Sequence, residues 1–260
     1  MGGPASHSLE HFWQKLQNVS DRILLLDYDG TLAPFQTERD KAFPYQGVRE
    51  ILEKIQASGQ TRLIIVSGRT VTDILPLLGL KNIPEVWGSH GFERRLPDGS
   101  LIAQDLDLNS HHSLENAYNW MKEHGFDNDC EIKPASLAFH WRRREKNQRL
   151  QLDETIRSAW APFTKDGNLS IHPFDGGLEL RYNSFNKGKA VKQILNEYDK
   201  EIVVAYLGDD LTDEDAFKAL KGKGLSVLIR DTYRNTLADC WLKPPAELLD
   251  FLQNWNRYSS

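Results

Sequence analysis

The stretch Ile23-Leu24-Leu25-Leu26-Asp27-Tyr28-Asp29-Gly30-Thr31 decides the fold, because four consecutive apolar residues lead directly into two carboxylates and a glycine. Further apolar runs at 63–66, 202–207 and 225–229 end in the same manner, in Ser67-Gly68, Gly208-Asp209-Asp210 and Arg230-Asp231. Continuous apolar runs are typical of strands that are buried on both faces. The pattern therefore predicts a parallel sheet.

Helical periodicity fills the segments between these runs. Apolar residues recur at helical spacing over 48–55, 71–78, 190–195 and 248–255. Thr212 precedes three acidic residues, which predicts an N-cap and an acidic first turn for another helix. Alternating strands and helices predict an α/β fold, a Rossmann-like parallel-sheet core.

The middle of the chain has a different pattern. Residues 107–182 carry two helical stretches, and Leu137, Phe139 and Trp141 alternate with more polar neighbours. Such alternation predicts a sheet with one solvated face. We therefore predict an α+β domain at 107–182, inserted into a core that is formed by 1–106 and 183–260.

The amino-acid composition argues against several classes of protein. Lys and Arg total 32 and Asp and Glu total 37 in 260 residues, so the net charge is −5. An acidic chain is a poor candidate for a nucleic-acid partner, which requires a basic surface. The sequence contains no apolar run of membrane-spanning length. Cys130 and Cys240 are too few for a disulfide framework, so we expect reduced thiols and a cytoplasmic location.

The first apolar run delivers two carboxylates to one point. Ligands of open α/β sheets bind beyond the carboxyl ends of the strands. Asp27 and Asp29 are two residues apart at such an end, and Gly30 allows the chain to turn away. Alternatively, this segment is an acidic turn that has no catalytic or binding role.

Ser67-Gly68-Arg69-Thr70 follows the second run and precedes a predicted helix. A hydroxyl and free amides at a helix N-terminus form an anion site. A Ser-Gly turn that merely caps the helix would give the same sequence.

The third run ends in an acidic segment, because five of the seven residues from Asp209 to Asp215 are Asp or Glu. These charges repel one another unless a cation lies among them. Ligands that are all oxygen favour a hard cation, Mg²⁺ before Ca²⁺. Lys187 or Lys189, at the start of the preceding helix, could neutralise a bound anion.

Taken together in this order, the motifs resemble the haloacid-dehalogenase-like (HAD) phosphatases, and finer features are similar to the trehalose-6-phosphate phosphatase family. The resemblance covers nearly the whole chain after about Arg22. It rests on seven segments: 26–34, Val66-Ser67-Gly68-Arg69, Gly88-Ser89-His90-Gly91-Phe92-Glu93, Glu131-Ile132-Lys133, His140-Trp141-Arg142, Asn186-Lys187-Gly188-Lys189-Ala190 and 208–215.

The resemblance implies roles for the catalytic residues. Asp27 would attack phosphorus and become an aspartyl-phosphate, while Asp29 would protonate the leaving oxygen and then activate water. Ser67, Gly68 and Lys187 would bind the phosphoryl oxygens. The magnesium ligands would be Asp27, the carbonyl of Asp29 and Asp209, with support from Asp213.

The inserted domain would then be the cap of the family, which closes over the sugar and determines specificity. Period-two spacing places Ser136, His140 and Arg142 on one face, while Lys133 has the wrong parity for that set. The residues expected to contact the sugar are Lys133, His140, Arg142 and Glu179 from this domain and His90 from the core.

The sequence therefore predicts a Mg²⁺-dependent phosphatase, a phosphoric monoester hydrolase that acts on a small phosphosugar, most specifically trehalose 6-phosphate. Other phosphosugars remain open, such as a glycosylglycerate or sucrose phosphate. A non-catalytic phosphosugar-binding module is a further alternative, although no candidate catalytic position is missing. A receiver domain is usually far shorter, and a phosphomutase would use the same pair of aspartates.

Overall fold

The computed structural model describes residues 5–36, 38–141, 144–174 and 176–259. The chain forms two compact units, one from Met1–Ile102 and Lys187–Ser260 and the other from Ala103–Asn186. The domain boundaries expected from the sequence lie a few residues inside the second unit.

The larger sheet has eight strands in the order β12-β11-β10-β1-β2-β3-β4-β5. The strands from β12 to β3 are parallel to their neighbours, and β4 runs antiparallel to β3. Their bounds are β1 (Arg22–Leu26), β2 (Thr61–Val66), β3 (Glu85–Gly88), β4 (Glu93–Arg95), β5 (Leu101–Ala103), β10 (Val203–Gly208), β11 (Leu225–Ile229) and β12 (Cys240–Leu242). The predicted parallel-sheet core is thereby confirmed.

Helices cover both faces of this sheet. They are α1 (Ala5–Asn18), α2 (Val48–Ala57), α3 (Val71–Leu78), α6 (Lys187–Leu195), α7 (Glu214–Leu220) and α8 (Ala246–Ser259). In β1, Leu24 and Leu26 join the core formed with α1, α2, α3 and α8, whereas Ile23 and Leu25 join the core formed with α6 and α7. Alternate residues of one apolar strand thus serve opposite layers, as its continuous hydrophobicity predicts.

The parallel register brings three strand ends to one edge. Leu26 at the end of β1 lies opposite Leu207 of β10 and Ile65 of β2. The segments that follow these strands, beginning at Asp27, Ser67 and Asp209, therefore emerge at the same side of the sheet.

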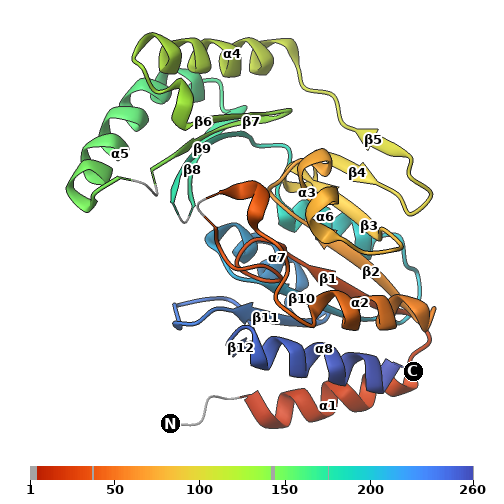
Figure 1. Ribbon diagram of the computed structural model, residues 1–260. Coiled ribbons are helices and arrows are strands. Elements are labelled where there is room, and N and C mark those ends of the chain that lie inside the picture. The colour runs from red at the N-terminus through yellow and green to blue at the C-terminus, as the bar shows by residue number, and fades with distance from the viewer. Residues whose placement is uncertain (1–4, 37, 142–143, 175, 260) are drawn as a thin grey trace. The chain divides into compact units, whose positions relative to one another are not determined.

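Helix α1 packs against α8, beside which it lies in Figure 1. The rings of Phe12 and Trp255 are 6.0 Å apart, and those of Trp13 and Phe251 are 4.9 Å apart. Arg22 donates hydrogen bonds to the carbonyls of Leu16 and Ser259 and so links both helices to β1. The amphipathic N-terminal segment belongs to the core of the first unit.

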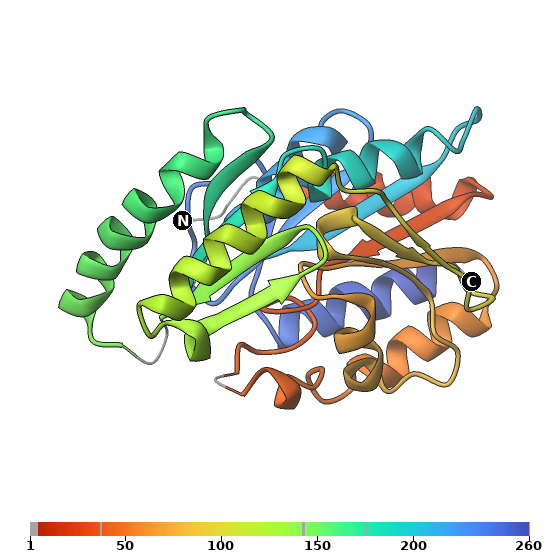
Figure 2. The same cartoon turned by 90° about the horizontal axis from the view of Figure 1, so that it is seen from above.

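The second unit is a four-stranded antiparallel sheet with the order β6-β7-β9-β8. Figures 1 and 2 show α4 and α5 on one side of it. The bounds are α4 (Leu108–Glu123), β6 (Cys130–Lys133), β7 (Ser136–His140), α5 (Lys146–Trp160), β8 (Leu169–Phe174) and β9 (Gly177–Tyr182). Met121, Trp160, Phe139 and Leu178 are among the residues that form its apolar core.

One local expectation holds only in part and another is wrong. The polar face of the smaller sheet is solvated only in part, because the side chain of His140 is 31 % exposed whereas Ser136, Glu179 and Arg181 are 4 %, 2 % and 4 % exposed. Thr212 is not an N-cap: a 3-10 turn at Leu211–Asp213 intervenes, and Asp210 caps it by accepting a hydrogen bond from the amide of Leu211.

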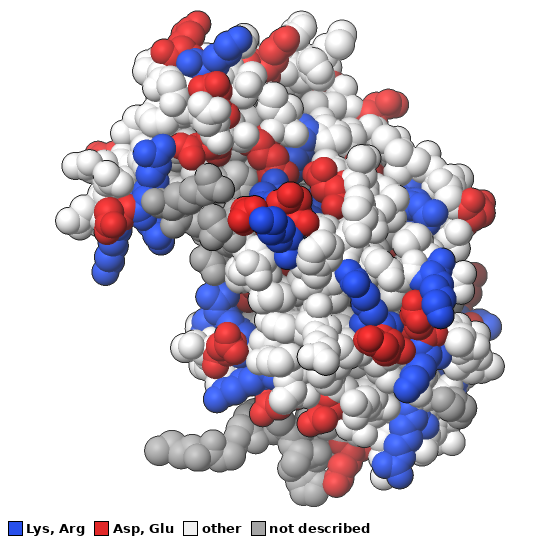
Figure 3. All heavy atoms as spheres, in the orientation of Figure 1, with Lys and Arg blue, Asp and Glu red and all other residues white. Residues whose placement is uncertain are grey.

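Among the helices that the structure describes, none is both long enough and apolar enough to cross a membrane. On the face drawn in Figure 3, acidic and basic side chains are interspersed over the described surface.

Candidate active site

Asp27 is buried where β1 ends. Its amide donates to the carbonyl of Leu207, which fixes it beside β10, and its side chain is 5 % exposed. Its Oδ1 accepts a hydrogen bond from Nζ of Lys187 at 2.7 Å, and its Oδ2 accepts one from Thr31. Burial raises the pKa of Asp27 to about 7, while the charge of Lys187 opposes this shift.

Lys187, at the start of α6, bridges two acidic segments that are far apart in the sequence. Its Nζ donates to Oδ1 of Asp27 and to Oδ1 of Asp213, both at 2.7 Å. Burial alone would lower the pKa of Lys187, but the charges of Asp213 and Asp27 raise it above its ordinary value. Lys189 is exposed. Of the two lysines, Lys187 is therefore the one that contacts Asp27, the candidate nucleophile.

Asp213 is fully engaged by hydrogen bonds. Its Oδ1 accepts from the hydroxyl of Tyr206 at 2.6 Å in addition to Lys187, and its Oδ2 accepts from the amides of Asp209 and Asp210 at 3.0 Å each. By accepting these four hydrogen bonds, the carboxylate fixes the positions of the groups that donate to it. Its geometry suits the supporting role expected for it better than direct coordination of a metal.

Asp209 is the opposite case. It is 1 % exposed, yet neither carboxylate oxygen accepts a hydrogen bond from any described residue. The guanidinium of Arg230 is 3.9 Å from Oδ2. Burial, followed by the charges of Asp27 and Asp213, raises the pKa of Asp209 well above its ordinary value. A buried carboxylate without hydrogen bonds is costly unless a cation compensates it.

The donor set fits a hard cation. Single carboxylate oxygens of Asp27, Asp209 and Asp213 all lie within 4.8 Å of one another, and all three residues are buried. Gly30, at φ +83°, makes room for this cluster, because a Cβ there would lie 2.2 Å from Oδ2 of Asp209. Carboxylate oxygens, including those of Asp209 that accept no hydrogen bond from the described residues, are suitable ligands for Mg²⁺.

Two arginines hold the acidic loop from outside. Arg234 donates to the carbonyls of Asp209 and Asp210, and its Nη1 contacts Glu214. Arg230 lies beside Asp209. Neither arginine was predicted to be part of the site, although the acidic segment indicated that a cation must lie nearby.

Fewer backbone amides of the turn after β2 are available to bind an anion than the sequence suggests. The amide of Arg69 donates to Oγ of Ser67, and the amide of Val71, which begins α3, donates to Oε2 of Glu93. Two of the amides expected to be available to an anion are thus engaged within the protein. Ser67 and Gly68 remain the predicted phosphate ligands.

Asp29 is half-buried and bound by Arg69. Arg69 donates from Nε to Oδ2 at 2.6 Å and from Nη2 to Oδ1 at 2.7 Å, and from Nη1 to the carbonyl of Arg39. A bidentate guanidinium fixes the plane of a carboxylate. Arg69 belongs to the Ser67-Gly68-Arg69 motif, but no sequence pattern predicts its pairing with Asp29.

His90 is 5 % exposed and lies beside the Ser67 turn, to whose carbonyl its amide donates. Its imidazole packs on Gly68, where a Cβ would lie 2.7 Å from Cε1. Ser89 and His90 both have positive φ, 49° and 58°. Such conformations cost on the order of 1–3 kcal/mol each and cluster at functional sites.

In the second unit, the expected sugar contacts lie in one ion-pair network. Lys133 pairs with Ser136 across the β6–β7 hairpin and so shares its face, contrary to the parity expected from a single strand. Lys133 and Ser136 donate to Oε1 of Glu179 at 3.0 and 2.7 Å. His140 lies 3.0 Å from Glu131. Arg142 lies outside the described residues, so its expected contact stays a prediction.

Comparison with known proteins shows the family to which the chain belongs. The trehalose-phosphatase family profile matches residues 25–238. The chain is 27% identical over 264 residues to probable trehalose-phosphate phosphatase C of Arabidopsis thaliana, which covers 95% of this chain and 81% of that protein. It is 30% identical over 241 residues to the trehalose-phosphate phosphatase of Mycobacterium marinum, covering 88% of this chain and 60% of that one.

Solved structures share the fold. The C-terminal domain of the C. albicans trehalose-6-phosphate phosphatase aligns with a TM-score of 0.83 at 21% identity, covering 95% of this chain and 96% of that chain. A haloacid-dehalogenase-like hydrolase from B. subtilis aligns with a TM-score of 0.64 at 14% identity, covering 89% and 98%. This chain belongs to the trehalose-phosphatase family, and it is a phosphoric monoester hydrolase.

Proposed function

We propose that this chain hydrolyses trehalose 6-phosphate to trehalose and phosphate in a Mg²⁺-dependent reaction. The observation that carries the proposal is the buried cluster in which Asp27 contacts Lys187 while the carboxylate of Asp209 accepts no hydrogen bond from the described residues. The names of the relatives, which are trehalose-phosphate phosphatases, support the choice of sugar.

In the first step, an oxygen of Asp27 attacks phosphorus and forms an aspartyl-phosphate. The bond from phosphorus to the sugar oxygen breaks, its electron pair stays on that oxygen, and Asp29 supplies the proton. Lys187, at 2.7 Å from Asp27, reduces the repulsion between the nucleophile and the phosphate. Ser67 and Gly68 bind the phosphoryl oxygens.

In the second step, Asp29 takes a proton from water, and the water oxygen attacks phosphorus. The bond between phosphorus and Asp27 breaks, which regenerates the carboxylate and yields phosphate. Asp29 is suited to both steps, because it lies two residues from Asp27 and is held in one orientation by Arg69.

Asp27, the main-chain carbonyl of Asp29 and Asp209 would hold the metal, with Asp213 orienting the loop through the amides of Asp209 and Asp210. A bound Mg²⁺ would neutralise negative charge on the phosphate and on the carboxylates around it. Tyr206 and Lys187 keep Asp213 in place from the opposite side.

The sugar would contact Lys133, His140, Arg142 and Glu179 of the second unit and His90 of the first. The proposal is supported by the network in which Lys133 and Ser136 donate hydrogen bonds to Glu179, because it gathers polar side chains that can bind sugar hydroxyl groups. We also propose a cytoplasmic location, which the two free cysteines Cys130 and Cys240 support.

A panel of phosphosugars, assayed with Mg²⁺ and with chelator, tests the proposal. We expect clear preference for trehalose 6-phosphate and loss of turnover with chelator. Preference for sucrose phosphate or a glycosylglycerate phosphate, with negligible turnover of trehalose 6-phosphate, would refute the assigned sugar. Undiminished turnover in chelator would refute the metal dependence.

A further inference from the structure

The segment Gly88-Ser89-His90-Gly91-Phe92-Glu93 has no role in the reaction beyond the sugar contact assigned to His90. It nevertheless has the most unusual backbone among the described residues. Ser89 and His90 are the described non-glycine residues with positive φ, and Gly91 follows at φ 102°. Non-glycine residues in this region are uncommon, and two in succession require strong external support.

The support comes from the turn after β2. The amide of Ser89 donates to the carbonyl of Arg69 at 2.7 Å, and the amide of His90 donates to the carbonyl of Ser67 at 2.9 Å. The imidazole of His90 fills the space above Gly68. The two turns are therefore joined at all three residues of Ser67-Gly68-Arg69, which contain the predicted phosphate ligands.

Glu93, at the start of β4, locks the two turns together. Its Oε2 accepts a hydrogen bond from Oγ of Ser89 at 2.8 Å and one from the amide of Val71 at 3.2 Å. Glu93 is 8 % exposed. One carboxylate oxygen thus ties the strained turn to the first residue of α3, which directly follows the phosphate turn.

The consequences extend to Asp29. The carbonyl of Arg69 accepts a hydrogen bond from the amide of Ser89, and the side chain of Arg69 binds Asp29 at 2.6 and 2.7 Å. A displacement of the Ser67–Arg69 backbone would therefore move both the phosphate ligands and the carboxylate that is assigned to proton transfer.

We propose that Glu93, acting through Ser89, is a positioning residue that sets the Ser67-Gly68-Arg69 turn for phosphoryl binding. This inference rests on the proposed function for the identity of the bound phosphoryl group. Glu93 itself does not touch the substrate, so its loss should weaken phosphate binding and turnover through the backbone of the turn.

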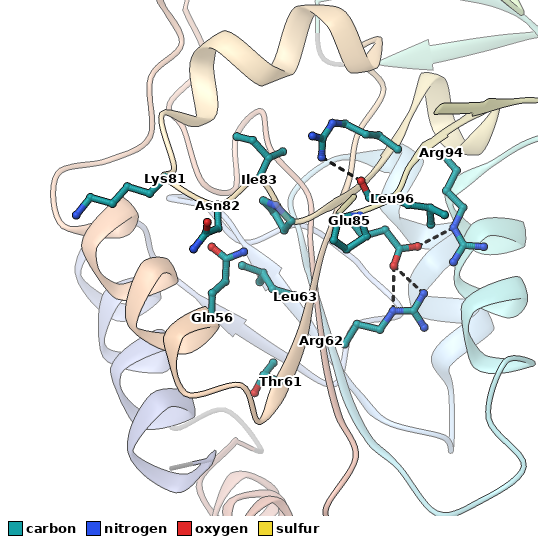
Figure 4. Close-up of a pocket in the computed structure, with 13 residues that line it drawn as sticks. Gln56, Thr61, Arg62, Leu63, Lys81, Asn82, Ile83, Glu85, Arg94 and Leu96 are labelled. Atoms are coloured by element: carbon teal, nitrogen blue, oxygen red, sulfur yellow. Dashed lines mark hydrogen bonds and ion pairs between the residues drawn. The ribbon is translucent and has the colours of Figure 1, made fainter. Parts of the chain in front are cut away.

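Glu85 offers a matched control, as Figure 4 shows. It is also a buried glutamate, 3 % exposed, and it begins β3, next to β4 in the same sheet. Its carboxylate accepts hydrogen bonds from Arg62, Arg94 and Trp87 and none from the Ser67–Arg69 turn. Losing this carboxylate should reduce stability without displacing the phosphate turn.

The experiment compares Glu93→Ala, Glu93→Gln and Glu85→Gln with the unmodified chain in Mg²⁺. For Glu93→Ala we expect kcat/KM on trehalose 6-phosphate to fall roughly tenfold to a hundredfold, since small misplacements of reacting groups have effects of this size. The inhibition constant of inorganic phosphate should rise in parallel. Glu93→Gln, which retains an acceptor oxygen, should recover most of both quantities.

Glu85→Gln should lower the Tm at least as much as Glu93→Gln while leaving the phosphate inhibition constant unchanged. Arg62→Lys replaces it as control if Glu85→Gln does not fold. Equal phosphate inhibition constants in Glu93→Ala and the unmodified chain would overturn the inference, as would equal loss in the Glu85 control. Ser89→Ala, which removes the hydroxyl alone, should show the same direction of change as Glu93→Ala.

Failure of the proposed function is distinguishable. If the unmodified chain hydrolyses no phosphosugar, the increase in Tm caused by inorganic phosphate still reports on the turn. A smaller increase in Glu93→Ala than in Glu85→Gln supports the positioning role, and equal increases contradict it.

Discussion

Arg69 donates two hydrogen bonds, from Nε and Nη2, to the carboxylate of Asp29 at 2.6 and 2.7 Å. Its Nη1 donates to the carbonyl of Arg39. The side chain of Arg69 is 5 % exposed, so the pair is shielded from solvent on the arginine side. The arrangement fixes where the carboxylate points.

We therefore expect Arg69→Lys to reduce kcat about tenfold to a hundredfold, because lysine cannot reproduce the planar fork. Steady-state kinetics on trehalose 6-phosphate measure this effect. Arg49→Lys is the control: Arg49 donates to the carbonyls of Leu77 and Leu78, at the far end of α3. It should lower the Tm and leave kcat alone. An unchanged kcat in Arg69→Lys would show that the pair is irrelevant to turnover.

Asp27→Asn should reduce turnover by at least about a thousandfold, as expected when a nucleophile is removed. The amide has nearly the same size, so circular dichroism should show an intact fold. Asp73→Asn, at an exposed position of α3, provides the control with normal activity. Normal turnover by the Asp27 variant would exclude this residue as the nucleophile.

Arg234→Gln should weaken Mg²⁺ binding by about tenfold or more, an effect typical of groups that orient metal ligands. The reason is the set of hydrogen bonds from Arg234 to the carbonyls of Asp209 and Asp210. Isothermal titration with Mg²⁺ measures the Kd without any turnover. The exposed Arg257 supplies the control, since Arg257→Gln should bind Mg²⁺ as the unmodified chain does. Identical Kd values for both variants would contradict this account.

Glu179→Gln should raise the KM for trehalose 6-phosphate and lower the Tm. Removing one partner of a buried ion pair leaves the other charge uncompensated, at a cost of about 3–5 kcal/mol. Combining it with Lys133→Met removes one of the two cations that Glu179 pairs with, and Arg181 at 3.9 Å is the other, so the double variant should recover part of the Tm but not the KM. Hydrolysis of p-nitrophenyl phosphate, which has no sugar, serves as the comparison. Equal losses on both substrates would argue against a sugar contact.

Both thiols should react slowly in the folded chain. Burial, with Asp129 and Asp127 near one thiol and Asp239 near the other, raises the pKa of Cys130 and Cys240 to about 12 from 9.0. The thiolate is the reactive form. At pH 8, iodoacetamide followed by mass spectrometry should show much faster labelling in urea than in buffer. Equal rates would contradict the shift.

The raised pKa values of the two thiols also predict how the free energy of unfolding changes with pH. A raised pKa in the folded state means that the protonated thiols contribute stability fully below about pH 9, and this contribution is lost as the pH rises towards 12. Urea unfolding at pH 7 and pH 10 should therefore give a lower free energy of unfolding at pH 10. Cys240→Ala should reduce that difference.

The sequence was sufficient for the central strands and their ends. Leu24 and Ile23 belong to a run that only a doubly buried strand explains, and Asp27 and Asp209 follow from strand ends that meet at one edge. These features depend on hydrophobic period and topology, which are local or general properties.

What escaped prediction depends on long-range partners. Arg69 binds Asp29 across 40 positions of sequence, and Lys133 shares a face with Ser136 only because a hairpin joins their strands. The short strand at Glu93–Arg95 has no periodicity long enough to read. The burial of Glu179 was not predicted, because alternation assigns each residue to a face and does not show that Lys133 and Ser136 donate to its carboxylate.

The position of β1 has a consequence for how the chain is made. β1 pairs with β10, but Ala103–Asn186 lies between them in the sequence and forms a unit of its own. During synthesis, this later unit can fold while one edge of β1 still awaits Val203–Gly208. Asp27 and Asp209 meet only after that strand arrives. One edge of an apolar strand therefore stays unpaired in the nascent chain until Val203–Gly208 has emerged.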